Sequence, residues 1–197
     1  MSDEPIYFLR HGQTEWNAIK RLQGHLDSPL TGTGRGHAAA QGRLLTSVFE
    51  ANPDIPIFAS PLGRVRETVQ IALGPHGRIA ETREDLKEIT AGNWDGLLQS
   101  EIAQDWPKLF AEAAGQDLEL YACGPGGDGF EGLATRVRAM LDELPRPCVV
   151  FSHGLYGKML RGLYVGLDRA AINALPNTQG CIFVLEDGRE RVLAEVP

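Results

Sequence analysis

The sequence IYFLRHGQTEWN, residues 6–17, decides how we interpret this 197-residue chain. Its first four residues are apolar, and such a short apolar run predicts a strand that is buried on both faces. The run ends at Arg10, His11 and Gly12, so a cation, a titratable ring and a flexible residue enter the next loop together. Because ligands bind at the carboxyl ends of strands in open α/β sheets, this loop is the first candidate for a functional site.

An apolar run followed by a polar loop recurs at two other places. Residues 149–151 precede His153, and residues 57–59 precede a loop that leads to Arg64. Three strand ends are therefore expected to bring two arginines and two histidines to one rim of the sheet. Guanidinium groups match the oxygens of a phosphate, and an imidazole can bind or attack it. The pattern indicates a phosphate site.

Length and composition set the general class. A chain that is 43% hydrophobic and 23% charged is expected to form one globular domain over residues 1–197. The net charge of −7 argues against a nucleic-acid partner and means that only a local arginine cluster can attract an anion. No apolar run approaches membrane-spanning length, and no signal-peptide pattern opens the chain, so we expect a cytoplasmic protein without a membrane partner.

The three cysteines, Cys123, Cys148 and Cys181, are far apart and form no metal-ligand pattern. We expect Cys148 and Cys181 to be thiols in the core, within strands, as is usual in a reducing compartment.

The apolar pattern alternates between strands and helices. Helices are expected from Thr31 or Thr33 to about Glu50, over Gly63–Leu73, from a Ser100 cap through Phe110 with an interruption at Pro107, over Phe130–Leu144 and Gly154–Tyr164, and briefly after Asp168. Strands are expected at residues 6–9, 57–59, near Ile79, near Cys148, and in a hairpin of 180–185 and 189–194. Residues 13–30 and 115–129 are expected to be loops. The alternation predicts an α/β sandwich.

Five segments resemble, in order, the motifs of the histidine phosphatase superfamily, also called the phosphoglycerate mutase-like family. They are LRHGQTEWN (9–17), RLQGHLDSPLTGTG (21–34), ASPLGRVRET (59–68), LKEITAGNWDG (86–96) and FSHG (151–154). Residues 98–125 match no diagnostic motif. The resemblance implies a three-layer sandwich with a mixed, mostly parallel sheet between helices, and a reaction that needs no metal or other cofactor.

The resemblance also assigns roles. His11 would be the nucleophile that becomes a phosphohistidine, and Arg10, Arg64 and His153 would hold the phosphoryl oxygens. Glu88 would protonate the leaving oxygen and then activate water. The other residues expected to line the pocket are Thr14, Asn17, Gln23, Gly24 and Gly154.

Elementary chemistry agrees with these roles. An imidazole with its ordinary pKa of about 6.5 is mostly neutral, and hence nucleophilic, near pH 7. Nearby arginines oppose its protonation, and a hydrogen bond to a carbonyl, with Gly12 as the candidate, would aim the other ring nitrogen at phosphorus. The leaving group needs a proton near neutral pH, and burial of Glu88 beside a bound phosphate favours a protonated acid.

Other interpretations of the same residues are weaker. A metal site of His11, His153 and an acid is disfavoured, because two adjacent arginines would repel a dication. Ser152 lacks the G-x-S-x-G elbow of a serine hydrolase. The glycines at 32, 34 and 36 lack dinucleotide-loop spacing and no strand precedes them, so they favour a loosened helix start. Other acidic residues near Glu88 could take the role of the acid, and only the spacing of the motif favours Glu88.

The substrate is the least determined feature. A phosphoglycerate mutase needs cations for the substrate carboxylate, but between Glu88 and Arg136 the only basic residue is Lys108. Apolar residues within 98–125 favour a lid for an organic leaving group. We therefore expect a phosphatase acting on a small phosphorylated metabolite. A cofactor-dependent phosphoglycerate mutase is the alternative, and a non-catalytic phosphate-binding module is less favoured. The oligomeric state is left open, a homo-oligomer included.

Overall fold

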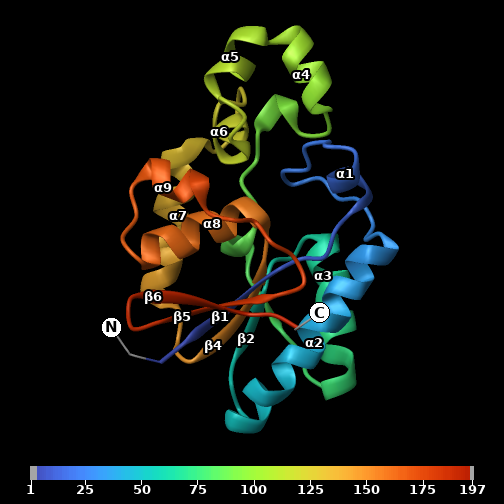
Figure 1. Ribbon diagram of the computed structural model, residues 1–197, viewed down its shortest axis with the longest axis vertical. Helices are drawn as coiled ribbons and strands as arrows, with labels where there is room; N and C mark the ends of the chain where they lie inside the picture. Colours follow the sequence, from blue (N-terminus) through green and yellow to red (C-terminus); the bar gives the residue numbers. More distant parts are fainter. Residues whose placement is uncertain (1–3, 196–197) are drawn as a thin grey trace.

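A six-stranded sheet forms the centre of the computed structural model, which describes residues 4–195 (Figure 1). Its order is β3-β2-β4-β1-β5-β6. The strands are β1 (Ile6–Arg10), β2 (Ile57–Ala59), β3 (Glu81–Thr82), β4 (Cys148–Ser152), β5 (Ile182–Glu186) and β6 (Arg189–Leu193). The first four of these in space run parallel, whereas β5 and β6 are antiparallel to their neighbours. The predicted mixed, mostly parallel sheet is confirmed.

Helices cover both faces of the sheet, so the three-layer arrangement is also confirmed (Figure 1). On one face lie α2 (Gly32–Ala51) and α3 (Gly63–Leu73), and on the other lie α7 (Gly129–Glu143), α8 (Gly154–Tyr164) and α9 (Arg169–Ala174). The shorter helices are α1 (Glu15–Ala18), α4 (Gln99–Asp105), α5 (Pro107–Glu112) and α6 (Asp117–Ala122), with 3₁₀ turns at Gly74–His76, Glu84–Leu86 and Gly92–Trp94.

The strand β1 is buried on both faces because alternate side chains enter different cores. Ile6 and Phe8 pack with α7 and α8, while Tyr7 and Leu9 pack with α2 and α3. The four residues are at most 8% exposed. A continuous apolar run is therefore what this central position requires, and the run places Arg10 and His11 at the end of a rigid strand.

The helix start at residues 32–36 is shaped by one close backbone contact. A Cβ on Gly34 would lie 2.0 Å from the carbonyl oxygen of Gln13, and one on Gly12 would lie 2.1 Å from that of Gly34. By contrast, no atom lies within 4 Å of a Cβ built on Gly32 or Gly36. Gly34 therefore lets the loop after β1 pack directly on α2, which is a more specific role than loosening the helix start.

Three expectations about the bounds of helices and loops were wrong. Residues 13–30 include α1, because Thr14 and Asn17 form a reciprocal capping box. Residues 115–129 include α6, whose buried Leu118 and Leu120 gain more from packing than the glycines around them cost. The weak strand expected near Ile79 is β3, which begins two residues after this 90% exposed residue. The helix expected to start with a Ser100 cap begins at Gln99.

The remaining elements agree with expectation. Thr31 caps α2, α3 has the predicted bounds, and the chain breaks between α4 and α5 at Pro107. Cys148 and Cys181 are both buried as expected, but only Cys148 lies within a strand, β4, whereas Cys181 directly precedes β5. Within residues 4–195 no helix is long and apolar enough to cross a membrane.

Candidate active site

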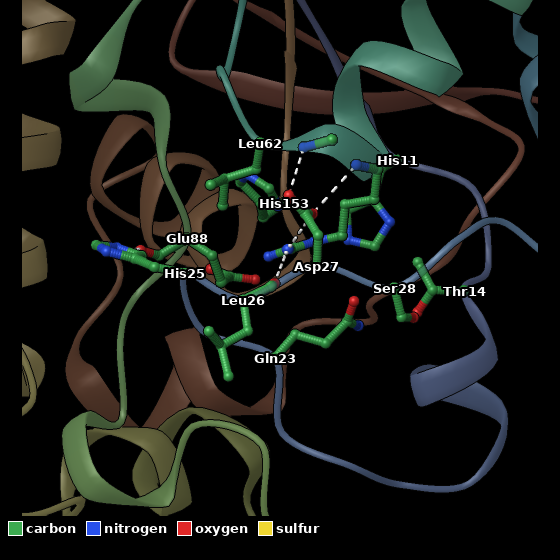
Figure 2. Close-up of polar contacts among 12 residues, drawn as sticks. His11, Thr14, Gln23, His25, Leu26, Asp27, Ser28, Leu62, Glu88 and His153 are labelled. Carbon is green, nitrogen blue, oxygen red and sulfur yellow. Dashed lines mark hydrogen bonds and ion pairs between the residues drawn. The ribbon is translucent and has the colours of Figure 1, made fainter.

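Three neighbouring strand ends bring the predicted side chains together (Figure 2). β1 and β4 are paired in parallel, with Arg10 opposite Ser152, so His11 and His153 leave the sheet side by side. Their ring centroids are 5.3 Å apart. Ser60, which follows β2, lies 2.7 Å from Nε2 of His153 through its Oγ. The expected meeting of distant segments at one rim is what the structure shows.

A cavity of about 580 Å³ opens at this rim. The side chains of Arg10, His11, Arg64 and Glu88 line its floor together with Gly154. A Cβ on Gly154 would lie 2.8 Å from Nε of Arg10, so a glycine at this position leaves room for the guanidinium group. Four of the five residues expected to act on a phosphate therefore border one space, and His153 is buried next to His11.

His11 is held firmly in backbone and ring. Its N–H donates to the carbonyl of Ser152 at 3.0 Å, and its carbonyl accepts from the side chain of Gln179 at 2.9 Å. Ring Nδ1 lies 2.8 Å from the carbonyl oxygen of Gly12, whose own N–H is fixed by Thr68. Because a carbonyl only accepts, Nδ1 carries the hydrogen in the neutral ring and Nε2 carries the free lone pair.

Burial and nearby positive charges favour the neutral form of both histidines. Burial lowers the pKa of His11 well below its ordinary value, and the charges of Arg64 and Arg10 lower it further. The pKa of His153 is also well below its ordinary value, first through burial and then through Arg64 and His11. A neutral His11 has the lone pair that a nucleophile needs. The expected effect of the arginines is present, but burial is the larger cause.

Arg64 is only 1% exposed although it opens a helix. Its Nη1 donates to the carbonyl of Leu26 at 2.6 Å and to Asp27 at 3.0 Å, and its Nη2 donates to the carbonyl of Gly24 at 2.8 Å. Asp27 also accepts from the backbone N–H groups of Gly63 and Arg64, so it caps α3 from outside. The segment 24–27 therefore fixes the guanidinium group in place.

Several donors around His11 are buried and lack a partner. They are Nε of Arg10, Nε of Arg64 and Nδ1 of His153. Buried polar groups are nearly always hydrogen-bonded, so two such atoms on residues that line the cavity, with a third on His153 next to His11, indicate that a ligand with several acceptors belongs there. A tetrahedral oxyanion has acceptors in the required number and arrangement.

Glu88 is 6% exposed and is held by backbone groups. Its Oε1 accepts from the N–H groups of Ile89 at 3.1 Å and Tyr156 at 2.7 Å. Its Oε2 accepts from the N–H of Leu155 at 3.0 Å. Two of these donors belong to the first turn of α8, which starts just after His153. The start of α8 therefore ties the carboxyl group to the histidine pair.

The other predicted lining residues divide into two groups. Asn17 and Gln23 border the cavity, as expected. Thr14 is fully buried and caps α1, so it positions Asn17. Gly24 positions Arg64 through its carbonyl group. These last two residues act behind the surface that a ligand would touch.

Sequence reasoning missed part of the wall. Asn177 and Gln179 line the cavity from the loop before β5, and Lys20 and Arg21 line it from the segment after α1. The start of β5 lies beside the end of β1 because these two strands are antiparallel. The hairpin pattern was visible in the sequence, but the position of β5 next to β1 was not.

The expected apolar lid needs correction. Most apolar side chains of residues 98–125 pack on one another and around Trp94, in a third cluster apart from the two main cores. From this region it is Gln99, Gly115, Asp117 and Tyr121 that border the cavity. The part of the cavity wall that this region supplies is therefore mainly polar.

Comparison with known proteins places the chain in a family. The family model described as histidine phosphatase superfamily (branch 1) matches residues 6–195. The chain belongs to this superfamily. A relative named probable phosphoglycerate mutase GpmB, from Photorhabdus laumondii, is 34% identical over 178 residues, which are 84% of this chain and 77% of the relative.

Solved structures of similar proteins agree with the fold. YhfR from Bacillus stearothermophilus is 30% identical with a TM-score of 0.79, over 97% of this chain and 96% of that chain. A mycobacterial glucosyl-3-phosphoglycerate phosphatase, solved with VO3, is 27% identical with a TM-score of 0.77, over 98% of each chain.

The buried histidines of this superfamily member predict an acid-sensitive stability. The unfolded chain binds protons at both rings below about pH 6.5, whereas the folded chain does not, so stability is complete above this pH and falls as the pH decreases further. We expect the free energy of unfolding in urea to decrease between pH 7.5 and pH 5.5. In His11→Asn the decrease should be smaller, by up to about 1.4 kcal/mol per pH unit. Equal pH slopes for the two proteins would contradict the assignment.

Proposed function

We propose that this protein is a phosphatase that hydrolyses a small phosphomonoester through a phosphohistidine on Nε2 of His11. The observation that carries the proposal is the group of buried, unpartnered donors on Arg10, Arg64 and His153 around that ring. Phosphoryl transfer requires positioning and charge stabilisation more than covalent chemistry by the protein, and these donors supply both.

The first step forms one bond and breaks one. The lone pair on Nε2 of His11 attacks phosphorus, and the bond from phosphorus to the ester oxygen breaks. The leaving oxygen takes a proton from Glu88. Both lone-pair sites of Oε1 in Glu88 are used by N–H donors, whereas Oε2 accepts only one, so Oε2 is the atom that can carry this proton.

The second step reverses the roles. Water attacks the phosphohistidine and gives a proton to Glu88, phosphate leaves, and His11 regains its lone pair. His153 donates a hydrogen bond from Nδ1–H to the phosphoryl oxygens. This requires the tautomer with hydrogen on Nδ1, in which Ser60 donates its hydroxyl hydrogen to Nε2. Ser60 can do so because its oxygen accepts the N–H of Leu62 at 3.4 Å, which leaves the hydrogen free.

The test is release of phosphate. We expect turnover of 4-nitrophenyl phosphate and of a subset of phosphorylated metabolites, with no loss when a chelator is present. The related glucosyl-3-phosphoglycerate phosphatase supports this choice by its name, as does its complex with VO3. Loss of turnover with chelator that zinc restores would contradict the proposed mechanism.

A phosphoglycerate mutase is the second candidate, and one observation favours it. Lys20 and Arg21 border the cavity and supply cations that the segment between Glu88 and Arg136 lacks. The relative named probable phosphoglycerate mutase GpmB points the same way. Interconversion of 3- and 2-phosphoglycerate in the presence of the bisphosphate, without net phosphate release, would select the mutase. Asp117, which also borders the cavity, adds a negative charge that disfavours an anionic leaving group, and it is our reason for preferring the phosphatase.

A further inference from the structure

Arg136 of α7 holds the segment that carries Glu88. Its Nη1 donates to the carbonyls of Asp85 at 3.1 Å and Lys87 at 2.5 Å, and its Nη2 donates to the carbonyl of Glu88 at 3.3 Å. Residues 87–90 belong to no helix or strand, so the carbonyls of Lys87 and Glu88 depend on side chains for their hydrogen bonds, and that of Glu88 also lies 3.0 Å from Nε2 of His25. One planar guanidinium group thus binds one carbonyl of the 3₁₀ turn Glu84–Leu86 and two carbonyls of the irregular segment that follows it.

The same guanidinium group also secures the chain beyond Glu88. Nη2 of Arg136 lies 3.0 Å from Oδ2 of Asp128, and this oxygen accepts the N–H of Thr90 at 3.3 Å. The backbone around Glu88 is therefore fixed on both sides. On one side Arg136 binds the carbonyls of residues 85, 87 and 88, and on the other side Asp128 binds the N–H of Thr90.

A third contact links Arg136 to the carboxyl group itself. The guanidinium carbon lies 5.5 Å from the centroid of the Tyr156 ring, over its face. The backbone N–H of Tyr156 donates to Oε1 of Glu88 at 2.7 Å. Arg136 thus contacts both the backbone that carries Glu88 and the residue that binds its side chain.

We propose that Arg136 is a positioning residue for the acid Glu88, and that it sets how well the protein expels poor leaving groups. The described residues that line the cavity do not include Arg136, so its effect reaches the substrate through Glu88. This inference rests on the proposed function, in which Glu88 protonates the leaving oxygen. A displacement of the acid by about 1 Å is enough to impair proton transfer severely.

The experiment compares two substrates of similar shape, 4-nitrophenyl phosphate and phenyl phosphate. The nitrophenolate leaves with little protonation, whereas phenolate, with a conjugate-acid pKa of about 10, depends on it. In Glu88→Gln we expect kcat/KM to fall at least about 10-fold more for phenyl phosphate. Arg136→Gln should show the same selectivity at roughly 3- to 10-fold, and Arg136→Lys should recover part of the loss.

Two controls separate positioning from general damage. Arg138 lies on the same helix two residues on and is exposed, so Arg138→Gln should match the wild type on both substrates. The double variant Glu88→Gln with Arg136→Gln should lose no more selectivity than Glu88→Gln alone, because removing the acid leaves nothing to position. Thermal unfolding of each variant identifies those that are folded at the assay temperature. If Arg136→Gln is not folded, Arg136→Lys takes its place in the comparison.

The outcomes distinguish the two proposals. Equal losses on both substrates in Arg136→Gln and Arg136→Lys, or losses that add to those of Glu88→Gln, overturn the positioning role and leave the acid role of Glu88 intact. If Glu88→Gln itself shows no leaving-group selectivity, the assignment of the acid fails and the positioning role fails with it. If the wild type releases no phosphate from either ester, the proposed function fails.

Discussion

Replacing His11 by alanine is expected to lower kcat/KM on 4-nitrophenyl phosphate by at least about 10³-fold, because it removes the nucleophile and no neighbouring group replaces it. His153 is the nearest alternative, with its ring centroid 5.3 Å away, but its Nε2 is bonded to Ser60. The folded state should survive the change, since His11 is anchored mainly through backbone groups.

A second measurement on the same variant tests the covalent intermediate. Rapid quenching of the wild type with ³²P-labelled substrate should trap an acid-labile, base-stable protein phosphate, and His11→Ala should give none. The matched control is His76→Ala, because His76 lies in the 3₁₀ turn after α3, where its ring is bonded to the carbonyl of Gly42, and it is not among the described residues that line the cavity. Wild-type labelling in His11→Ala would show that another residue is the nucleophile.

Replacing Arg64 by methionine should have the second largest effect. We expect kcat/KM to fall by about 10²- to 10³-fold, because a fixed donor and charge beside the transferring phosphoryl group disappear. Stability should also decrease, by roughly 2–4 kcal/mol, because the carbonyls of Gly24 and Leu26 lose a buried charged donor. The side chain is 1% exposed, so water does not compensate for this loss.

The control for Arg64 lies two positions along the same helix. Arg66 is exposed, and Arg66→Met should leave activity within about 2-fold of the wild type and stability within about 0.5 kcal/mol. Urea unfolding and steady-state kinetics of both variants check the prediction. An Arg64→Met protein with wild-type kcat/KM would remove this residue from the site, whatever its effect on folding.

Local sequence was sufficient to predict the central parallel strands and the residues that follow them, but not the order of the strands in the sheet. The apolar runs in β1, β2 and β4 are buried, and burial on both faces is what makes a strand apolar throughout. The polar residues that directly follow such strands must lie at the rim of the sheet, where the strands end. The hydrogen bond from His11 to Gly12 could be expected because the two residues are adjacent.

Contacts between distant segments could not be predicted in the same way. The buried position of Arg64 depends on carbonyls 38 and 40 residues earlier in the chain, and that of Glu88 on N–H groups 67 and 68 residues later. The helix α6 was mistaken for a loop because its two buried leucines stand among glycines and acids. The structure shows these contacts, whereas the catalytic roles of the single residues stay predictions until the variants above are measured.

The third apolar cluster, around Trp94 and Ile102, has a consequence for how the protein can change. In Figure 1, α4 and α5 stand at one end of the molecule, apart from the sheet, and this cluster stabilises them there. Mutations in this end can therefore accumulate without disturbing the strands that carry His11 and His153. Because Gln99, Gly115, Asp117 and Tyr121 supply part of the cavity wall from this region, changes there can alter the wall while the strand ends that hold the two histidines stay as they are.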